Sequence, residues 1–506
     1  MVVQHNMQAM NANRMLNVTT GAQSKSTEKL SSGYKINRAA DDAAGLSISE
    51  KMRKQIRGLD QASSNAQDGV SAVQTAEGAL TEVHSMLQRM YELAVQAANG
   101  TNSESDRQSI QDEIDQLTTE IDRVAETTKF NETYLLKGGE GTKKINLGAH
   151  DAGLKGKLTD NGDGTATFVM DTLKDGDKVS IGGKEYTIGS TVDQAKALIA
   201  QPASGTVDVK IGDKSFKITN TGEVQDAAGN KLYVKSANGA GAAATFSTTA
   251  ELTTESQFHK TTPDTGTLTD NNVVTVANLK DYVAGGVKVT VGTNTALAMT
   301  DADGDKIDDN NTAVISKEKA YQLAAQELLA ANKIGDTEGN AAVTLPDGTA
   351  ITNANGTGTF KIAVGKAEVA NTLSFNLHVG ADADMTNKIG VDIETMNSAY
   401  LGVKGLSVKD TSGNAATYAI DAIADAVAKV SSQRSALGAV QNRLEHTIAN
   451  VDNVVENSTS AESRIRDTDM AEEMVNYSKN NILAQAGQSM LAQANQSNQG
   501  VLSLLG

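Results

Sequence analysis

Apolar residues recur at intervals of seven along two long stretches near opposite ends of the chain. In the first stretch the series runs from Met52 to Ala94, and a second series three residues later ends at Ala97. In the second stretch it runs from Ile423 to Val451. This spacing places apolar side chains on one seam of a long α-helix, and the seam is stable only when another helix covers it. The pattern predicts two long helices, one from each end of the chain, packed side by side.

A third helix is predicted after Asn99-Gly100, where the heptad pattern stops. Ser105 and the three residues after it have the sequence of a capping box, which marks the start of a helix. From Ile110 to Val124 the apolar residues then step by four and three. We expect a short antiparallel pair of helices, with the carboxyl-terminal heptad helix as its third member.

The extreme ends of the chain carry weaker apolar stripes. At the amino end, Val3, Met7 and Met10 share one stripe of a helix that Gly33 can terminate. Helices with small apolar side chains and few aromatic ones are marginal when isolated. The stripe at the carboxyl end consists of Val475, Ile482, Leu483 and Met490.

The apolar period changes to two from about residue 145, which is typical of strands. Two hairpins are predicted at residues 179–188 and 207–218, each around a pair of turn residues. Short helices are expected near residues 192–200 and 316–331. The middle of the chain therefore predicts one or two small α+β or mainly β domains.

This insertion has its expected boundaries near residues 150 and 371. After it, residues 373–381 resume a strand pattern that echoes residues 145–149 before it, so we expect the two segments to lie near each other at the neck of the insertion. The predicted fold class is mainly α-helical, with coiled-coil or bundle arms from both termini and an inserted β-rich (α+β) outer region, in an elongated multi-domain subunit.

Composition removes several other possibilities. The 506-residue chain has no Cys, which excludes disulfides and thiolate metal sites, and only 3% aromatic residues, which suits helix bundles filled with aliphatic side chains. All its prolines lie between Pro202 and Pro346, so neither arm contains the residue that most disrupts a long helix. The first ten residues lack the charged and apolar regions of a signal peptide, and no apolar run approaches membrane-spanning length, so we expect no secretory signal and no membrane contact.

Charge adds one exclusion and one open question. The formal net charge of −17 argues against a nucleic-acid partner, because phosphate binding relies on clustered Lys and Arg. Residues 25–57 are nevertheless locally basic, and residues 456–473 are locally acidic. The two segments are either solvated helix faces or surfaces that match electrostatically within or between subunits.

The sequence offers little catalytic or metal-binding chemistry. Its six histidines are scattered, with no pair at the helical spacing of metal ligands, and it contains no Gly-x-Ser-x-Gly motif. Residues 301–308 resemble a calcium loop in their alternate carboxylates, but Lys306 stands where an EF-hand needs Gly and no Glu follows at the last ligand position. We expect an acidic turn there, and no enzymatic activity, metal or cofactor.

Several runs of residues resemble one known family. They are residues 30–46 (LSSGYKINRAADDAAGL), 88–99 (QRMYELAVQAAN), 438–444 (GAVQNRL) and 491–496 (LAQANQ), with the ending 501–505 (VLSLL). In these runs the chain resembles a bacterial flagellin, the subunit of the flagellar filament. The matching runs occur at both ends and say nothing specific about residues 150–371.

The resemblance implies a subunit in three parts. Residues 1–45 with 457–506 would pair as terminal helices in the inner tube of the filament, where neighbouring subunits cover their weak apolar stripes. Residues 46–150 with 372–456 would form a helical bundle domain with a short β neck. Residues 151–371 would form the variable β-rich outer region.

A place in the flagellum is also implied. The resemblance implies motility, an extracellular location, export by the flagellar type III apparatus, and an export chaperone that holds the carboxyl-terminal arm. Besides other copies of itself, the subunit would contact the flagellar cap and hook-junction proteins.

A receptor site is implied as well. In flagellins, Toll-like receptor 5 of vertebrates binds the end of the long helix and the helix that faces it. The matching positions here are Arg89, Leu93 and Glu113, supported by Gln88 and Gln96. The alternative is that Leu93 and Glu113 serve only lateral packing between subunits. Met90 and Tyr91 depart from the family pattern.

Three other classes of protein compete with this interpretation. A hook–filament junction protein has related helical ends but would diverge from the runs quoted above. A coiled-coil surface adhesin would explain heptads that flank a β-rich head, but it needs a secretory signal and an anchor. An enzyme displayed on a filament is disfavoured by the missing catalytic motifs.

Overall fold

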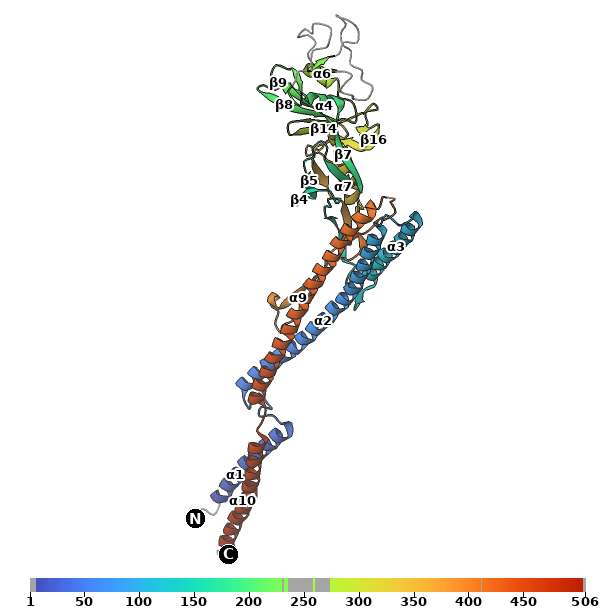
Figure 1. The fold of residues 1–506 in the computed structure, drawn as a ribbon. Coiled ribbons are helices and arrows are strands. Elements are labelled where there is room, and N and C mark those ends of the chain that lie inside the picture. The colour runs from blue at the N-terminus through green and yellow to red at the C-terminus, as the bar shows by residue number, and fades with distance from the viewer. Residues whose placement is uncertain (1–5, 230–231, 235–257, 260–273, 411, 504–506) are drawn as a thin grey trace, which may run out of the picture. The chain divides into compact units, whose positions relative to one another are not determined.

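The computed structural model describes residues 6–229, 232–234, 258–259, 274–410 and 412–503 (Figure 1). The chain divides into two compact units. Helices α2 (Ala43–Ala97) and α9 (Asn414–Arg466) contribute residues to both. The first unit comprises residues 1–77, 374–392 and 435–506, and the second comprises residues 78–373 and 393–434.

In the first unit the two ends of the chain pair as helices. Helix α1 (Met7–Ser32) packs along α10 (Met470–Ser503), as Figure 1 shows. Asn6 caps α1 and also donates its side-chain Nδ2 to the Ala494 carbonyl oxygen at 3.1 Å. Gly33, at φ 76°, ends α1 in the left-handed conformation that glycine adopts without strain, as predicted.

The segments that follow α1 and precede α10 are joined to each other. The Lys35 N–H donates to the Arg466 carbonyl oxygen at 2.6 Å, and the Thr468 N–H donates to the Gly33 carbonyl oxygen at 3.0 Å. The Arg466 guanidinium lies 4.7 Å from the centre of the Tyr34 ring. Its Nη1 also lies 2.9 Å from Glu50 Oε1, so this arginine ties the connecting segments to α2.

The remainder of the first unit consists of parts of α2 and α9 covered by a hairpin. Strands β20 (Leu373–His378) and β21 (Lys388–Ile393) pair with each other, and the 3₁₀ helix η2 (Met385–Asn387) lies between them. A small apolar core includes Ala66 of α2, Leu444 of α9 and Ile389 of the hairpin. The side chain of Leu377 packs directly against Gly69 of α2. A Cβ at Gly69 would lie only 2.2 Å from Leu377 Cδ1.

The second unit contains the predicted helical bundle. Helix α3 (Glu104–Thr127) and the unit's parts of α2 and α9 bury their apolar seams. The heptad prediction is confirmed, because almost every seam position from residue 66 onward is buried. The fully or nearly fully buried seam residues of this unit include Leu80, Val83, Leu87, Met90 and Ala94 of α2, Ile114 and Ile121 of α3, and Ile423 and Val430 of α9.

The predicted start of α3 is wrong by two residues. The N-cap is Ser103, whose Oγ accepts the Asp106 N–H at 3.2 Å while the Asp106 carboxylate accepts the Ser103 N–H at 3.0 Å. Ser105 lies inside the first turn. The carboxylate three residues after Ser103 completes the reciprocal pair, whereas Gln108 bonds to the Asp112 carboxylate instead.

The neck of the insertion is built from a different pair of strands than expected. Strand β3 (Gly139–Asn146) pairs antiparallel with β19 (Lys366–Asn371), so the prediction that residues 373–381 lie beside residues 145–149 is wrong. The last strand of the insertion, β19, pairs with β3, and β20 pairs with β21 instead. Lys143 of β3 reinforces the neck with hydrogen bonds to Glu394 at 2.6 Å and Thr372 at 2.9 Å.

Two short elements also pack in this unit. Helix α8 (Ser398–Leu401) is tied to α3, because the Ser398 N–H donates to Asp122 Oδ1 at 2.7 Å. Strands β1 (Lys129–Phe130) and β2 (Thr133–Tyr134) form a tight hairpin whose two turn residues both have positive φ, 43° at Asn131 and 69° at Glu132.

The insertion contains two main sheets in its described part. A nine-stranded sheet has the order β10-β9-β8-β13-β14-β7-β16-β15, with β6 also paired to β7, and a four-stranded sheet has the order β17-β18-β5-β4. Strand β7 is parallel to both β14 and β16. The strands of the larger sheet are β6 (Lys178–Ile181), β7 (Lys184–Thr191), β8 (Thr206–Ile211), β9 (Lys214–Thr219), β10 (Val224–Asp226), β13 (Lys288–Val291), β14 (Asn294–Met299), β15 (Ile307–Asp308) and β16 (Asn311–Ser316). Those of the smaller are β4 (Gly156–Asp160), β5 (Thr165–Met170), β17 (Ala342–Thr344) and β18 (Thr359–Ala363).

Short helices and two separate cores complete the insertion. The remaining elements are helices α4 (Val192–Leu198), α6 (Val276–Lys280) and α7 (Lys317–Asn332), and the paired strands β11 (Tyr233–Val234) and β12 (Phe258–His259). One core includes the stacked rings of Phe168 and Phe360, whose centroids are 6.2 Å apart. The other gathers around Phe216, Leu279 and Val289. Both predicted hairpins, β6–β7 and β8–β9, and the two predicted helices are confirmed.

Candidate interaction surfaces

Helices α1 and α10 expose large apolar side chains along their lengths. Met7 of α1 is 68% exposed, and Val475 and Ile482 of α10 are 67% and 66% exposed. Met10 and Met490 of the predicted stripes are also exposed, whereas Val3 lies outside the described residues. Large contiguous apolar surface is uncommon on monomeric soluble proteins and marks an interaction site. The predicted stripes are therefore available for a partner.

Part of this apolar surface was not predicted from the sequence. Met15 and Val18 of α1 and Met470 and Met474 of α10 are about half exposed or more. Helical spacing gives a signal for Val18, which follows Met7 by eleven residues and so lies near the same face.

A groove lies between α1 and α10. It has a volume of about 670 Å³, and Leu483, predicted as a stripe residue, lines it together with Met15, Leu16 and Met490. Gly487 permits the close approach of the helices here, because a Cβ at this position would lie 3.3 Å from Leu16 Cδ1. An apolar groove therefore remains between the two paired helices.

The predicted receptor site centres on an ion-paired arginine. Arg89 of α2 donates from Nε to Glu113 Oε1 of α3 at 2.8 Å and from Nη1 to Glu92 Oε2 at 3.2 Å. The hydrogen bond to Glu113 raises the pKa of Arg89, with smaller contributions from Glu92. The Arg89 side chain is half exposed, and Glu113 and Glu92 hold its guanidinium in place.

The other predicted members of this site have different surroundings. Gln88 is exposed and its Nε2 lies 3.0 Å from His84 Nε2, and Gln96 is exposed near the end of α2. Leu93, by contrast, is only 2% exposed. Arg89, Gln88 and Gln96 are therefore exposed on α2, while Leu93 is buried inside the unit.

Two exposed apolar residues beside this site were not predicted. Tyr91 is 42% exposed and Val95 is 48% exposed, and they lie one turn apart on α2. Both residues fall outside the heptad seam, so the seam pattern did not predict them.

The acidic turn at residues 301–309 has a cation of its own. The carboxylates of Asp301, Asp303 and Asp305 lie close enough to share a metal ion. Lys306, however, places its Nζ 3.1 Å from Asp301 Oδ2, and its backbone adopts a φ of 67°. Burial acts to raise the pKa of Asp301, but the hydrogen bonds and charge of Lys306 outweigh it and lower the pKa. The ammonium group thus neutralises the carboxylate that a metal ion would need.

In the described part of the chain, no helix combines the length and the hydropathy that crossing a bilayer requires.

Comparison with known proteins decides the family. Residues 3–140 match the bacterial flagellin N-terminal helical region, and residues 420–505 match the bacterial flagellin C-terminal helical region. A flagellin of Clostridium tyrobutyricum is 37% identical over 99% of this chain and 100% of its own length. The chain belongs to the bacterial flagellin family. A flagellin of Salmonella choleraesuis strain SC-B67 is 35% identical over 100% of this chain and 99% of its own length.

Solved structures similar to this flagellin include two flagellar proteins. FliC from Burkholderia pseudomallei is 20% identical, with 74% of this chain and 99% of that chain covered and a TM-score of 0.22. Flagellar hook associated protein-3 from Legionella pneumophila is 14% identical, with 82% and 98% covered and a TM-score of 0.30.

Membership of the family establishes what this flagellin is for. It is a structural subunit of the extracellular filament of the bacterial flagellum, the motility organelle.

Proposed function

We propose that the terminal helices of this flagellin form the inner tube of the filament by burying their exposed apolar stripes against neighbouring subunits. The observation that carries the proposal is the exposure of Met7, Val475 and Ile482, each about two-thirds accessible although α1 and α10 already pack together. Burial of one such side chain contributes about 1.5–3 kcal/mol, so a few of them per subunit are enough to drive assembly.

Truncation and substitution test this proposal. Electron microscopy after seeded polymerisation should show filaments from the full chain and none from a chain that lacks residues 1–35 and 470–506. Ile482→Ser should raise the critical concentration at least about tenfold, because about 1.4 kcal/mol corresponds to a factor of ten. Val169→Ser, at an exposed apolar position of the insertion, is the matched control and should leave the critical concentration unchanged. Equal effects of the two substitutions would contradict an assembly role for α10.

The proposed division of the subunit follows from the same assembly. Residues 1–45 with 457–506 form the inner tube, residues 46–150 with 372–456 form the helical domain around it, and residues 151–371 form the outer region. The β3–β19 pairing, which joins residues 139–146 to 366–371, supports a neck at this boundary. Limited proteolysis of filaments should release an outer fragment that begins near residue 150, and cleavage within the helical arms instead would contradict the division.

We propose that the subunit leaves the cell through the flagellar type III apparatus, with a chaperone on α10 before export. The exposed apolar residues of α10 support this, because such a helix needs cover in the cytoplasm. The flagellar cap and hook-junction proteins are the further partners at the filament ends. Export should fail in a strain that lacks the flagellar export ATPase, and secretion of the chain from such a strain would refute this route.

We propose that this flagellin is a ligand of Toll-like receptor 5 and binds the receptor through the surface around Arg89. The half-exposed guanidinium, held by Glu113 and Glu92, is the feature that supports it. Arg89→Ala should weaken binding of the monomer to the receptor ectodomain at least about tenfold, since hydrogen bonds to charged groups contribute about 1.5–3 kcal/mol. Arg123→Ala, which removes an exposed arginine from a helical-turn ion pair with Glu120, is the control.

The competing explanation is that this surface serves only packing between subunits. It predicts that Arg89→Ala alters polymerisation and leaves receptor binding of the monomer unchanged. Surface plasmon resonance on monomer and elongation rates on the same variant separate the two roles.

A further inference from the structure

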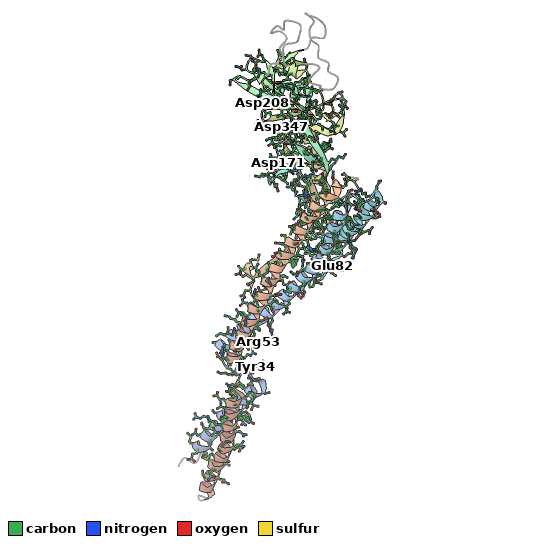
Figure 2. All side chains as sticks on the ribbon, viewed as in Figure 1. Tyr34, Arg53, Glu82, Asp171, Asp208 and Asp347 are labelled. Atoms are coloured by element: carbon green, nitrogen blue, oxygen red, sulfur yellow. The ribbon has the colours of Figure 1, made fainter. Side chains whose placement is uncertain are left out.

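A basic segment near the start of α2 has exposed charges without partners. Lys51, Lys54 and Arg57 are exposed, and among the described residues no carboxylate forms an ion pair with any of them. Arg53, labelled in Figure 2, lies in the same segment and is paired with Glu50 at 3.4 Å. Four basic residues within two turns stand out in a chain with a net charge of −17. Their mutual repulsion favours a partner surface that is acidic.

Helix α3 presents an acidic surface of the complementary kind. Its 24 residues include eight carboxylates and two arginines, and one of those arginines, Arg107, is buried. Asp112 and Asp115 are exposed and accept hydrogen bonds only from neutral amides, at 2.6 Å from Gln108 and 2.8 Å from Gln111. Their charges are therefore not neutralised by any Lys or Arg of the described chain.

Other carboxylates near the basic segment already have partners. Glu473 lies 3.8 Å from Lys29, and Glu462 lies 3.9 Å from Arg466. Asp469 accepts the N–H groups of Ala471 and Glu472 at the start of α10. Glu462 and Glu473 of the acidic segment at residues 456–473 are thus already paired with cations of the same chain, whereas among the described residues no Lys or Arg pairs with Asp112 or Asp115 of α3.

The two surfaces belong to different compact units of the chain, and among the described residues no ion pair joins them. Helix α2 is uninterrupted from Ala43 to Ala97, and α3 is attached near its far end through the Arg89–Glu113 ion pair. From Lys54 to Arg89, 35 residues of α-helix rise about 52 Å, a distance that no side chain spans. Pairing of these surfaces between two copies of the chain would neutralise the charges of both.

We propose that Lys51 and Lys54 of one subunit pair with Asp112 and Asp115 of another subunit displaced by about 50 Å along the α2 axis. Both pairs are spaced three residues apart on a helix, so two adjacent helices satisfy both ion pairs at once. The inference rests on polymerisation of the family and adds which charged surfaces meet. The contact joins different patches on the two copies, as the heterologous interface of an open helical polymer requires.

Charge reversal in an equimolar mixture is the decisive experiment. The full chain carrying Lys51→Glu and Lys54→Glu, and a second full chain carrying Asp112→Lys and Asp115→Lys, should each elongate filament seeds poorly, with a critical concentration at least about tenfold above wild type. An equimolar mixture should polymerise at close to the wild-type concentration, because an alternating arrangement restores opposite charges at each contact. Only a contact between copies predicts this rescue.

Controls separate this contact from polymerisation in general and from misfolding. The wild-type chain must elongate the same seeds, and both variants must keep wild-type helical circular dichroism. Lys155→Glu with Lys157→Glu, an equal charge change at exposed positions just before and within β4, should leave elongation unchanged. The defect of each reversal should shrink between about 100 mM and about 1 M NaCl, where the Debye length falls from about 10 to about 3 Å. A mixture that polymerises no better than either variant alone overturns the proposal, as does wild-type elongation by either variant.

Discussion

Two glycines of α2 should respond in opposite directions to the same substitution. A Cβ at Gly69 would lie 2.2 Å from Leu377 Cδ1 and 3.3 Å from Leu444 Cδ1, whereas a Cβ at Gly78 would meet nothing within 4 Å. Both positions are interior to the helix, where alanine is favoured over glycine by about 1 kcal/mol. Gly78→Ala should therefore raise the free energy of unfolding by about 1 kcal/mol.

At Gly69 the gain in helix propensity is opposed by overpacking. The Leu377 side chain must leave its position in the apolar core between the β20–β21 hairpin, α2 and α9, and such forced shifts cost about 1–3 kcal/mol. The net effect of Gly69→Ala is expected to lie between zero and about 2 kcal/mol of destabilisation. The two variants should differ by about 2 kcal/mol, although each adds one methyl group to the same helix.

Thermal unfolding followed by circular dichroism measures the difference. Gly69 lies in the first unit and Gly78 at the start of the second, so each variant is compared with the wild-type transition of its own unit. A change of 1 kcal/mol shifts the midpoint by about 2–4 °C for 150–250 residues and by less for a larger unit, so Gly78→Ala should raise its transition by up to about 2–4 °C whereas Gly69→Ala should not raise its own. Hydrogen exchange should be faster in the β20–β21 hairpin of Gly69→Ala only. If Gly69→Ala raises the melting temperature as much as Gly78→Ala, the packing of Leu377 at this position is not the constraint inferred here.

Three further outcomes follow from single residues. Glu132 holds a positive φ in an exposed two-residue turn, a backbone conformation that glycine adopts without strain. Glu132→Gly should therefore raise the free energy of unfolding by about 1 kcal/mol in chemical denaturation, and a decrease would contradict backbone strain at this position. Asp336 accepts four backbone N–H groups, which outweigh the opposing effect of burial and lower its pKa below 3.8. Its contribution to stability is therefore present above about pH 4 and lost as the pH falls through the lower folded pKa, and Asp336→Asn should flatten this part of a plot of stability against pH. Because Lys306 neutralises Asp301, calorimetric titration should show no calcium binding tighter than about 1 mM, and a tighter site would refute that role for the lysine.

Much of the helical architecture could be read from the sequence, because helix periodicity is a local property. The seam positions Leu80, Leu87, Val430 and Leu437 are all buried as their spacing requires. The β-hairpins were equally local, since their turns contain residues suited to positive φ, such as Gly182. The start of α3 was missed by two residues because several polar side chains there can act as caps, and only their geometry selects one.

The candidate surfaces were only partly predictable. The exposed stripe residues of α1 and α10 could be predicted from weak amphipathicity. The exposure of Met15 and Met474, which extends this surface, is visible only in the folded structure. Leu93, next to the seam residue Ala94, was expected in the receptor surface and is buried, because the sequence does not say how far the packing extends beyond the seam.

The sequence by itself determined the long helices, their apolar seams, the β-rich insertion and the family. Only the tertiary structure decided that β3 pairs with β19, that Arg89 is held by Glu113, and that Arg466 joins the connecting segments. The physical reason is the range of the interactions. Periodicity and turn chemistry act between near neighbours in the chain and are written in short windows of sequence, whereas strand pairing and ion pairing join distant residues with many alternative partners, and the packed fold selects among them.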